Sequence, residues 1–151
     1  MLRARLSEAL KDALKAKDHR RTSTIRLILA AVKDRDITLR GSGKAECIAE
    51  DEILALLQTM VRQRTESIEL FEQGKRKDLA DREREEIKII RGFMPAQLDD
   101  EAIAEATRET IEELHAEGLK DVGRVMGTLK ARYTGQMDFG KASSVVKELL
   151  V

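Results

Sequence analysis

The sequence predicts an all-α protein, and three observations support this. The 151-residue chain contains a single proline and only 3% aromatic residues, while the helix formers Ala, Leu, Glu, Lys and Arg are abundant. Charged residues make up 37% and hydrophobic residues 42%, a balance that suits helices with one wet face and one buried face. No run alternates polar and apolar residues over the length of a strand. We therefore expect a larger N-terminal domain of about four helices, followed by a C-terminal three-helix unit.

The first two helices are predicted from the spacing of apolar residues. Leu2 to Leu14 carry a stripe at intervals of three and four residues. Asp18 is a suitable N-cap for the second helix, whose stripe contains Ile25 and Val32. The segment 41–43, Gly-Ser-Gly, ends it.

The third and fourth helices are predicted to form the rest of the N-terminal domain. Three acids that begin at Glu50 favour a helix N-terminus, and Gly74 is a suitable C-terminal stop. A fourth helix is expected over about 79–91, rich in arginine and glutamate. Because the residue before proline avoids the helical region, Pro95 breaks the pattern. We expect domains at 1–94 and 95–151.

Three aspartates mark the starts of the C-terminal helices. Asp99 is expected to cap the fifth helix, which Gly118 would close, and Asp121 to start the sixth. After a turn at 134–135, Asp138 is expected to cap the seventh. The predicted buried stripe of the sixth helix consists of Val122, Val125, Met126, Leu129 and Tyr133.

Charge is unevenly distributed although the chain is formally neutral. Residues 1–44 carry twelve Lys/Arg against five Asp/Glu, a net +7. Residues 99–117 carry eight acids against one arginine, and residues 118–151 carry six bases against three acids. Such asymmetry is compatible with a polyanionic partner, although each basic cluster also suits a simply solvated helix face.

The sequence offers no signature of a cofactor, a metal site or a membrane span. Segment 41–44 resembles part of a phosphate loop, but Thr38 and Ala45 occupy the places that need glycine and Ser/Thr. The two histidines, about 100 residues apart, lack metal-type spacing. One cysteine, Cys47, excludes an internal disulfide. We expect no cofactor, no metal, no membrane partner, no self-contained catalytic site and a cytoplasmic location.

The C-terminal unit holds the candidate binding residues. Its cations flank the predicted apolar stripe and would suit phosphate contacts, whereas the scarcity of aromatic residues argues against stacking on single-stranded bases. Gly123 and Gly127 each cost helix propensity, so we expect close approach there, either of the seventh helix or of an external ligand such as a ribose-phosphate strand. The candidate RNA-binding residues are Lys120, Arg124, Lys130, Arg132, Lys141 and Lys147.

Four segments in order along the chain resemble the GatB/YqeY family. They are Lys17–Lys33, Glu72–Leu79, Phe93–Leu98 and Asp121–Gly127. The turn before the last helix departs from this pattern, because it reads Gly-Gln-Met-Asp-Phe over 135–139 where many members have Gly-Arg-Ala-Asp-Gly.

The resemblance implies an all-helical fold in two parts and a link to tRNA. The same domain forms the tail of the B subunit of tRNA-dependent amidotransferases, whose family label is carbon–nitrogen ligase with glutamine as amide donor. By analogy, residues from about 99 to 150 would contact the tRNA elbow. The catalytic parts of those enzymes lie outside the shared domain, so we expect a non-catalytic tRNA-binding or accessory protein. The alternative is an adaptor that docks on an amidotransferase or an aminoacyl-tRNA synthetase without binding RNA.

Overall fold

The computed structural model describes residues 1–44 and 46–151; Ala45, named above for the phosphate-loop motif, lies outside the described residues. Within them the chain forms seven α-helices and one short 3-10 helix, with no strand. The prediction of an all-α fold with four and then three helices is therefore confirmed. Across the same residues, no helix combines the length and the apolar character that crossing a membrane requires.

The chain divides into two compact units, Met1–Pro95 and Ala96–Val151. Each unit has a hydrophobic core of its own. We call them the N-terminal unit and the C-terminal unit and describe each by itself.

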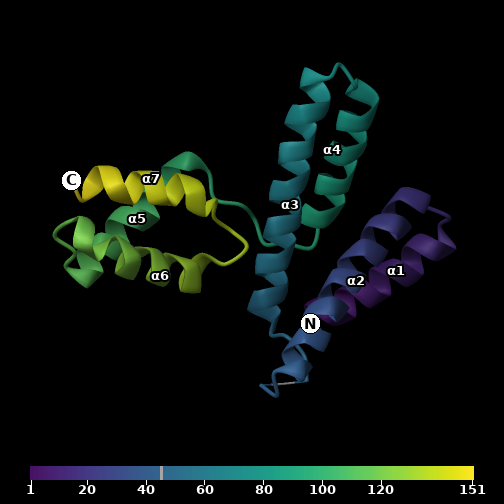
Figure 1. Cartoon of the computed structure of the whole chain (residues 1–151), viewed down its shortest axis with the longest axis horizontal. Coiled ribbons are helices and arrows are strands. Elements are labelled where there is room, and N and C mark those ends of the chain that lie inside the picture. The colour runs from purple at the N-terminus through teal and green to yellow at the C-terminus, as the bar shows by residue number, and fades with distance from the viewer. Residues whose placement is uncertain (45) are drawn as a thin grey trace. The chain divides into compact units, whose positions relative to one another are not determined.

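The N-terminal unit consists of two helical hairpins (Figure 1). Its core joins residues from all four helices, and Leu6, Ile28, Leu57 and Ile90 are fully buried in it. The helices are α1 (Leu2–Lys15), α2 (His19–Gly41), α3 (Glu50–Gln73) and α4 (Lys77–Arg91).

In this unit a side-chain cap starts α2 and a left-handed residue follows the end of α3. The Asp18 carboxylate accepts a hydrogen bond from the Arg21 backbone N–H at 3.1 Å, as predicted for an N-cap. At the end of α3, Gly74 is the C-cap, but the left-handed residue is Lys75, with φ of 57°. The Arg76 N–H then donates to the Phe71 carbonyl at 2.8 Å, which closes the turn.

Two ionic contacts hold elements of the N-terminal unit together. The Arg3 guanidinium donates two hydrogen bonds to the Asp36 carboxylate at 2.7 and 2.9 Å, and this carboxylate also accepts from the Ile48 N–H at 2.8 Å. Between α3 and α4, Arg64 Nε donates to Glu86 at 3.0 Å, with Glu83 at 4.0 Å. Because burial and the nearby Glu86 disfavour its charge, the pKa of Glu83 is raised.

The C-terminal unit is a three-helix arrangement with a short 3-10 turn (Figure 1). All three α-helices contact one another around Val125, Leu129, Met137 and Val146, which are fully buried. Its elements are α5 (Asp100–Leu114), η1 (Leu119–Asp121), α6 (Val122–Tyr133) and α7 (Phe139–Leu149).

Aspartates cap two of these helices as predicted, and Asp121 directly precedes α6 as predicted, but the expected end of α5 is wrong. The Asp99 carboxylate accepts from the Ala102 N–H at 2.8 Å, and that of Asp138 accepts from the Gly140 N–H at 2.9 Å. Helix α5 ends before Gly118, because His115 already adopts the left-handed conformation with φ of 51°. Asp121 accepts instead from the Glu117 N–H at 3.0 Å, which lowers the pKa of its carboxyl.

Candidate functional site

Helix α6 presents one buried side and one open side. Val125 and Leu129, four residues apart, face the core and are fully buried. Gly123, Gly127 and Lys130 recur at intervals of four and three residues on the exposed side. Lys120 lies in η1, three residues before Gly123, and is also exposed. We call the set Lys120, Gly123, Arg124, Gly127 and Lys130 the α6 face.

The two glycines of the α6 face border open space. A Cβ atom built at Gly123 or at Gly127 would meet no heavy atom of the described chain within 4 Å, outside the helix backbone itself. The expectation that α7 approaches these glycines is therefore wrong, because α7 packs against the side of α6 that carries Val125 and Leu129. The other alternative, approach by an external ligand, stays a prediction.

Two of the six predicted RNA-binding cations are engaged by acids of α5. Lys141 Nζ lies 2.9 Å from the Asp100 carboxylate, and an Arg132 guanidinium nitrogen lies 2.7 Å from that of Glu113. These hydrogen-bonded acids raise the pKa of Lys141 and of Arg132. Both cations therefore have an acidic partner within the C-terminal unit, in exposed ion pairs that water and salt weaken.

The remaining four predicted cations differ in whether an acidic side chain lies close to them. Arg124 approaches Asp121 at 3.4 Å, one turn away, and is about half exposed. For Lys120, Lys130 and Lys147 the described residues contain no ion pair. The structure thus places Lys120, Arg124 and Lys130 along the α6 face, while Lys147 lies in the last turn of α7.

The net charge of the C-terminal unit is opposite in sign to that of its last segment, residues 118–151. Residues 96–151 carry seven Lys/Arg and eleven Asp/Glu, a net −4, because this unit also contains the acidic helix α5. Residues 1–95 carry 21 Lys/Arg and 17 Asp/Glu, a net +4. The excess of positive charge therefore lies on the N-terminal unit.

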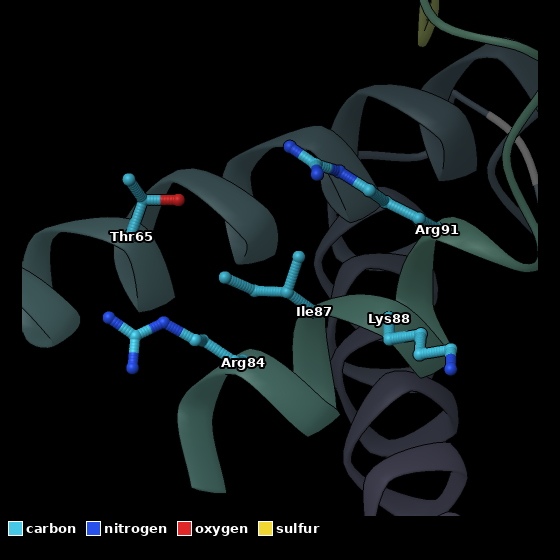
Figure 2. Close-up of a pocket in the computed structure, with 5 residues that line it drawn as sticks. All are labelled: Thr65, Arg84, Ile87, Lys88 and Arg91. Carbon is cyan, nitrogen blue, oxygen red and sulfur yellow. The ribbon is translucent and has the colours of Figure 1, made fainter. Parts of the chain in front are cut away.

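Sequence reasoning missed a hollow between α3 and α4. It has a volume of about 490 Å³ and is lined by Thr65 of α3 and by residues of α4 (Figure 2). Figure 2 shows the Arg84 and Arg91 side chains extending on either side of Ile87. The signal in the sequence is the spacing of Arg84, Lys88 and Arg91, which puts all three on one side of a helix. We call this feature the α4 hollow.

Two small helical units, each with a hydrophobic core of its own, define an all-α protein. The chain matches the family model described as Yqey-like protein over residues 3–150 and belongs to this family. The structure and this match support the YqeY part of the resemblance; the link to the amidotransferase B subunit stays a proposal.

Similar curated proteins come from fungi and share one name, "Altered inheritance of mitochondria protein 41, mitochondrial". The protein of Clavispora lusitaniae is 32% identical over 145 residues, covering 93% of this chain and 80% of that protein. That of Pyrenophora tritici-repentis is 29% identical over 151 residues, covering 97% and 79%. The protein of Lachancea thermotolerans is 37% identical over 91 residues, covering 60% of this chain and only 46% of its own length.

These relatives correct one expectation. The prediction of a cytoplasmic location is wrong, since the relatives are named as mitochondrial proteins. The error has a physical reason: a single cysteine indicates only that the fold does not depend on disulfides, and this does not single out one reducing compartment.

Proposed function

We propose that this protein is a non-catalytic RNA-binding protein, and that the α6 face contacts the sugar-phosphate backbone of a folded RNA of the tRNA class. The observation that carries the proposal is the open pair Gly123 and Gly127, which lies between Lys120 and Lys130. A helix surface without side chains admits close approach, and lysines at both ends supply the phosphate contacts. The resemblance to the tail of the amidotransferase B subunit supports the choice of tRNA.

The cost of the two glycines supports this assignment. A glycine inside a helix is less favourable than alanine by about 1 kcal/mol. Gly127 lies in the middle of α6, and no neighbouring atom would obstruct a methyl group there. Since packing within the unit does not require a glycine at this position, a ligand that approaches closely is the physical reason we assign to it.

The first test separates stability from binding with one substitution. We expect Gly127→Ala to raise the free energy of unfolding by up to about 1 kcal/mol while weakening the binding of total tRNA several-fold. Stability is measured by urea unfolding and binding by fluorescence anisotropy with labelled total tRNA. An alanine variant that is more stable and binds tRNA as tightly as the wild type would contradict the proposed close approach.

The second part of the test concerns the lysines. We expect the double variant K120Q/K130Q to lower the dependence of tRNA affinity on salt, with a slope smaller by roughly 1 for each phosphate that is no longer neutralised. The matched control is K11Q/K15Q, because both lysines are exposed on α1 and have no ion pair within the described residues. If the wild type binds no tRNA even at low salt, the proposal fails and a protein partner, an amidotransferase or an aminoacyl-tRNA synthetase, becomes the better explanation.

A further inference from the structure

The α4 hollow of the N-terminal unit has a cationic rim and an apolar floor. Arg84, Lys88 and Arg91 lie one turn apart on α4, and Ile87 between them is almost fully buried (Figure 2). With a rise of about 1.5 Å per residue, the three cations extend over roughly 10 Å of the helix. Figure 2 shows Arg84 and Arg91 on either side of Ile87, whereas the Lys88 side chain extends away from Ile87. The cations therefore lie around the rim of the hollow rather than in one row that faces it.

The three cations are not equally available. Arg84 already pairs with Glu72 and with Asp81, the latter at 2.8 Å, so its charge is less available to a ligand in the hollow. Lys88 and Arg91 are exposed, and neither has an acidic partner among the described residues. These two side chains are the ones that remain free to meet an anionic ligand.

Further unpaired cations gather at the same end of α4. The Arg5 guanidinium donates to the Gly92 carbonyl at 3.3 Å. Arg5 and Arg21 lie 5.8 and 5.6 Å from the centre of the Phe93 ring, and neither pairs with a carboxylate within the described chain. Part of this gathering is explained by the C-terminus of α4, whose dipole is equivalent to about −0.5 charge. That partial charge does not balance the four cations Arg5, Arg21, Lys88 and Arg91.

We propose that Lys88 and Arg91 at the rim of the α4 hollow bind phosphate groups of an RNA strand. This adds a second RNA-contacting surface on a different unit from the α6 face, and it extends the proposed function. An RNA strand suits the hollow because its phosphates repeat along the strand, as the cations do along the helix. The positive charge of the N-terminal unit lies on residues 1–44, at +7, whereas residues 45–95 carry a net −3. Arg5 and Arg21, which belong to residues 1–44, therefore add to the attraction at this end of α4.

The experiment compares four full-length proteins: wild type, K88Q/R91Q, K120Q/K130Q and the combination of both pairs. Binding of total tRNA is measured between about 50 and 200 mM salt, a range in which phosphate contacts change affinity strongly. We expect K88Q/R91Q to reduce the slope of log affinity against log salt by roughly 1.4–1.8, the contribution of two phosphate contacts. The control K11Q/K15Q is expected to leave the slope unchanged.

The outcomes separate this inference from the proposed function. A reduced slope in K88Q/R91Q, with K120Q/K130Q behaving as the wild type, supports the α4 hollow and contradicts the α6 face. A slope in K88Q/R91Q equal to that of K11Q/K15Q overturns the inference, whatever the α6 variants do. Poly-L-glutamate is the second probe. If K88Q/R91Q weakens the binding of poly-L-glutamate but not that of tRNA, the inference is overturned in favour of an acidic protein partner.

Discussion

Asp36 shows how one carboxylate positions three distant segments of the chain. It lies on α2, accepts two hydrogen bonds from Arg3 of α1, and accepts another from the Ile48 N–H in the segment before α3. These bonds favour the charged carboxylate and lower the pKa of Asp36 to about 2. Its partners are 33 and 12 residues away, so periodicity, which reports only near neighbours, could not reveal the contact.

The lowered pKa predicts the pH range in which Asp36 stabilises the fold. Since the carboxyl titrates near pH 3.9 in an unfolded chain, its contribution is fully present above that pH and is lost as the pH falls through about 2. We expect Asp36→Asn to lower the free energy of unfolding at pH 5–7, and the difference from the wild type to shrink below about pH 4. Urea unfolding at several pH values measures this. Asp34→Asn, at an exposed position two residues away, is the control, and a gap that stays constant down to about pH 2.5 would refute the prediction.

The end of α5 is an element that sequence reasoning placed incorrectly. Glycine is the most common left-handed residue at a helix end, which is why the sequence predicts that Gly118 closes this helix. The structure uses His115 instead, three residues earlier, and Gly118 is extended. The helix starts were easier to predict, because Asp18, Asp99 and Asp138 carry side chains that cap locally.

A glycine at the actual end of α5 should stabilise the C-terminal unit. The left-handed conformation costs a non-glycine residue about 1–2 kcal/mol, and a glycine would remove this cost. Part of the gain in stability is offset, because glycine has greater backbone freedom in the unfolded chain. His115 is exposed, so its replacement removes little packing. We expect His115→Gly to raise the free energy of unfolding by about 0.5–1 kcal/mol, as measured by urea unfolding, whereas His115→Ala should give no gain. Equal stability of the two variants would argue against strain at this position.

The described part of the chain contains two separate hydrophobic cores, so we expect its two units to unfold separately. Ile25 is fully buried in the N-terminal unit and Ile103 almost fully in the C-terminal unit, so the substitution of either by valine gives a matched pair. We expect calorimetry to resolve two unfolding transitions. Ile25→Val should lower the midpoint temperature of one and Ile103→Val that of the other, each at a cost of about 0.5–1.5 kcal/mol in the free energy of unfolding. A single transition that both variants shift equally would show that the units unfold together.

Charge counted by segment does not show which cations of the candidate site have acidic neighbours. The last segment, 118–151, is basic by itself, and all six of its cations are candidate RNA-binding residues on that count. Packing brings acids of α5 onto Arg132 and Lys141, contacts that join positions 19 and 41 residues apart. The glycines of the α6 face were visible in the sequence, but which side of them is open depends on where α7 packs, and only the structure provides that.

The opposite charges of the two units have a kinetic consequence for any polyanion that binds here. A negatively charged ligand is attracted over long range by residues 1–95 and repelled by residues 96–151, whose net charges are +4 and −4. Long-range attraction by the N-terminal unit would raise the rate at which an RNA arrives, and this rate would fall as salt screens the attraction. The phosphate contacts proposed at the α6 face and at the α4 hollow act only at short range, so they would govern how long an RNA stays.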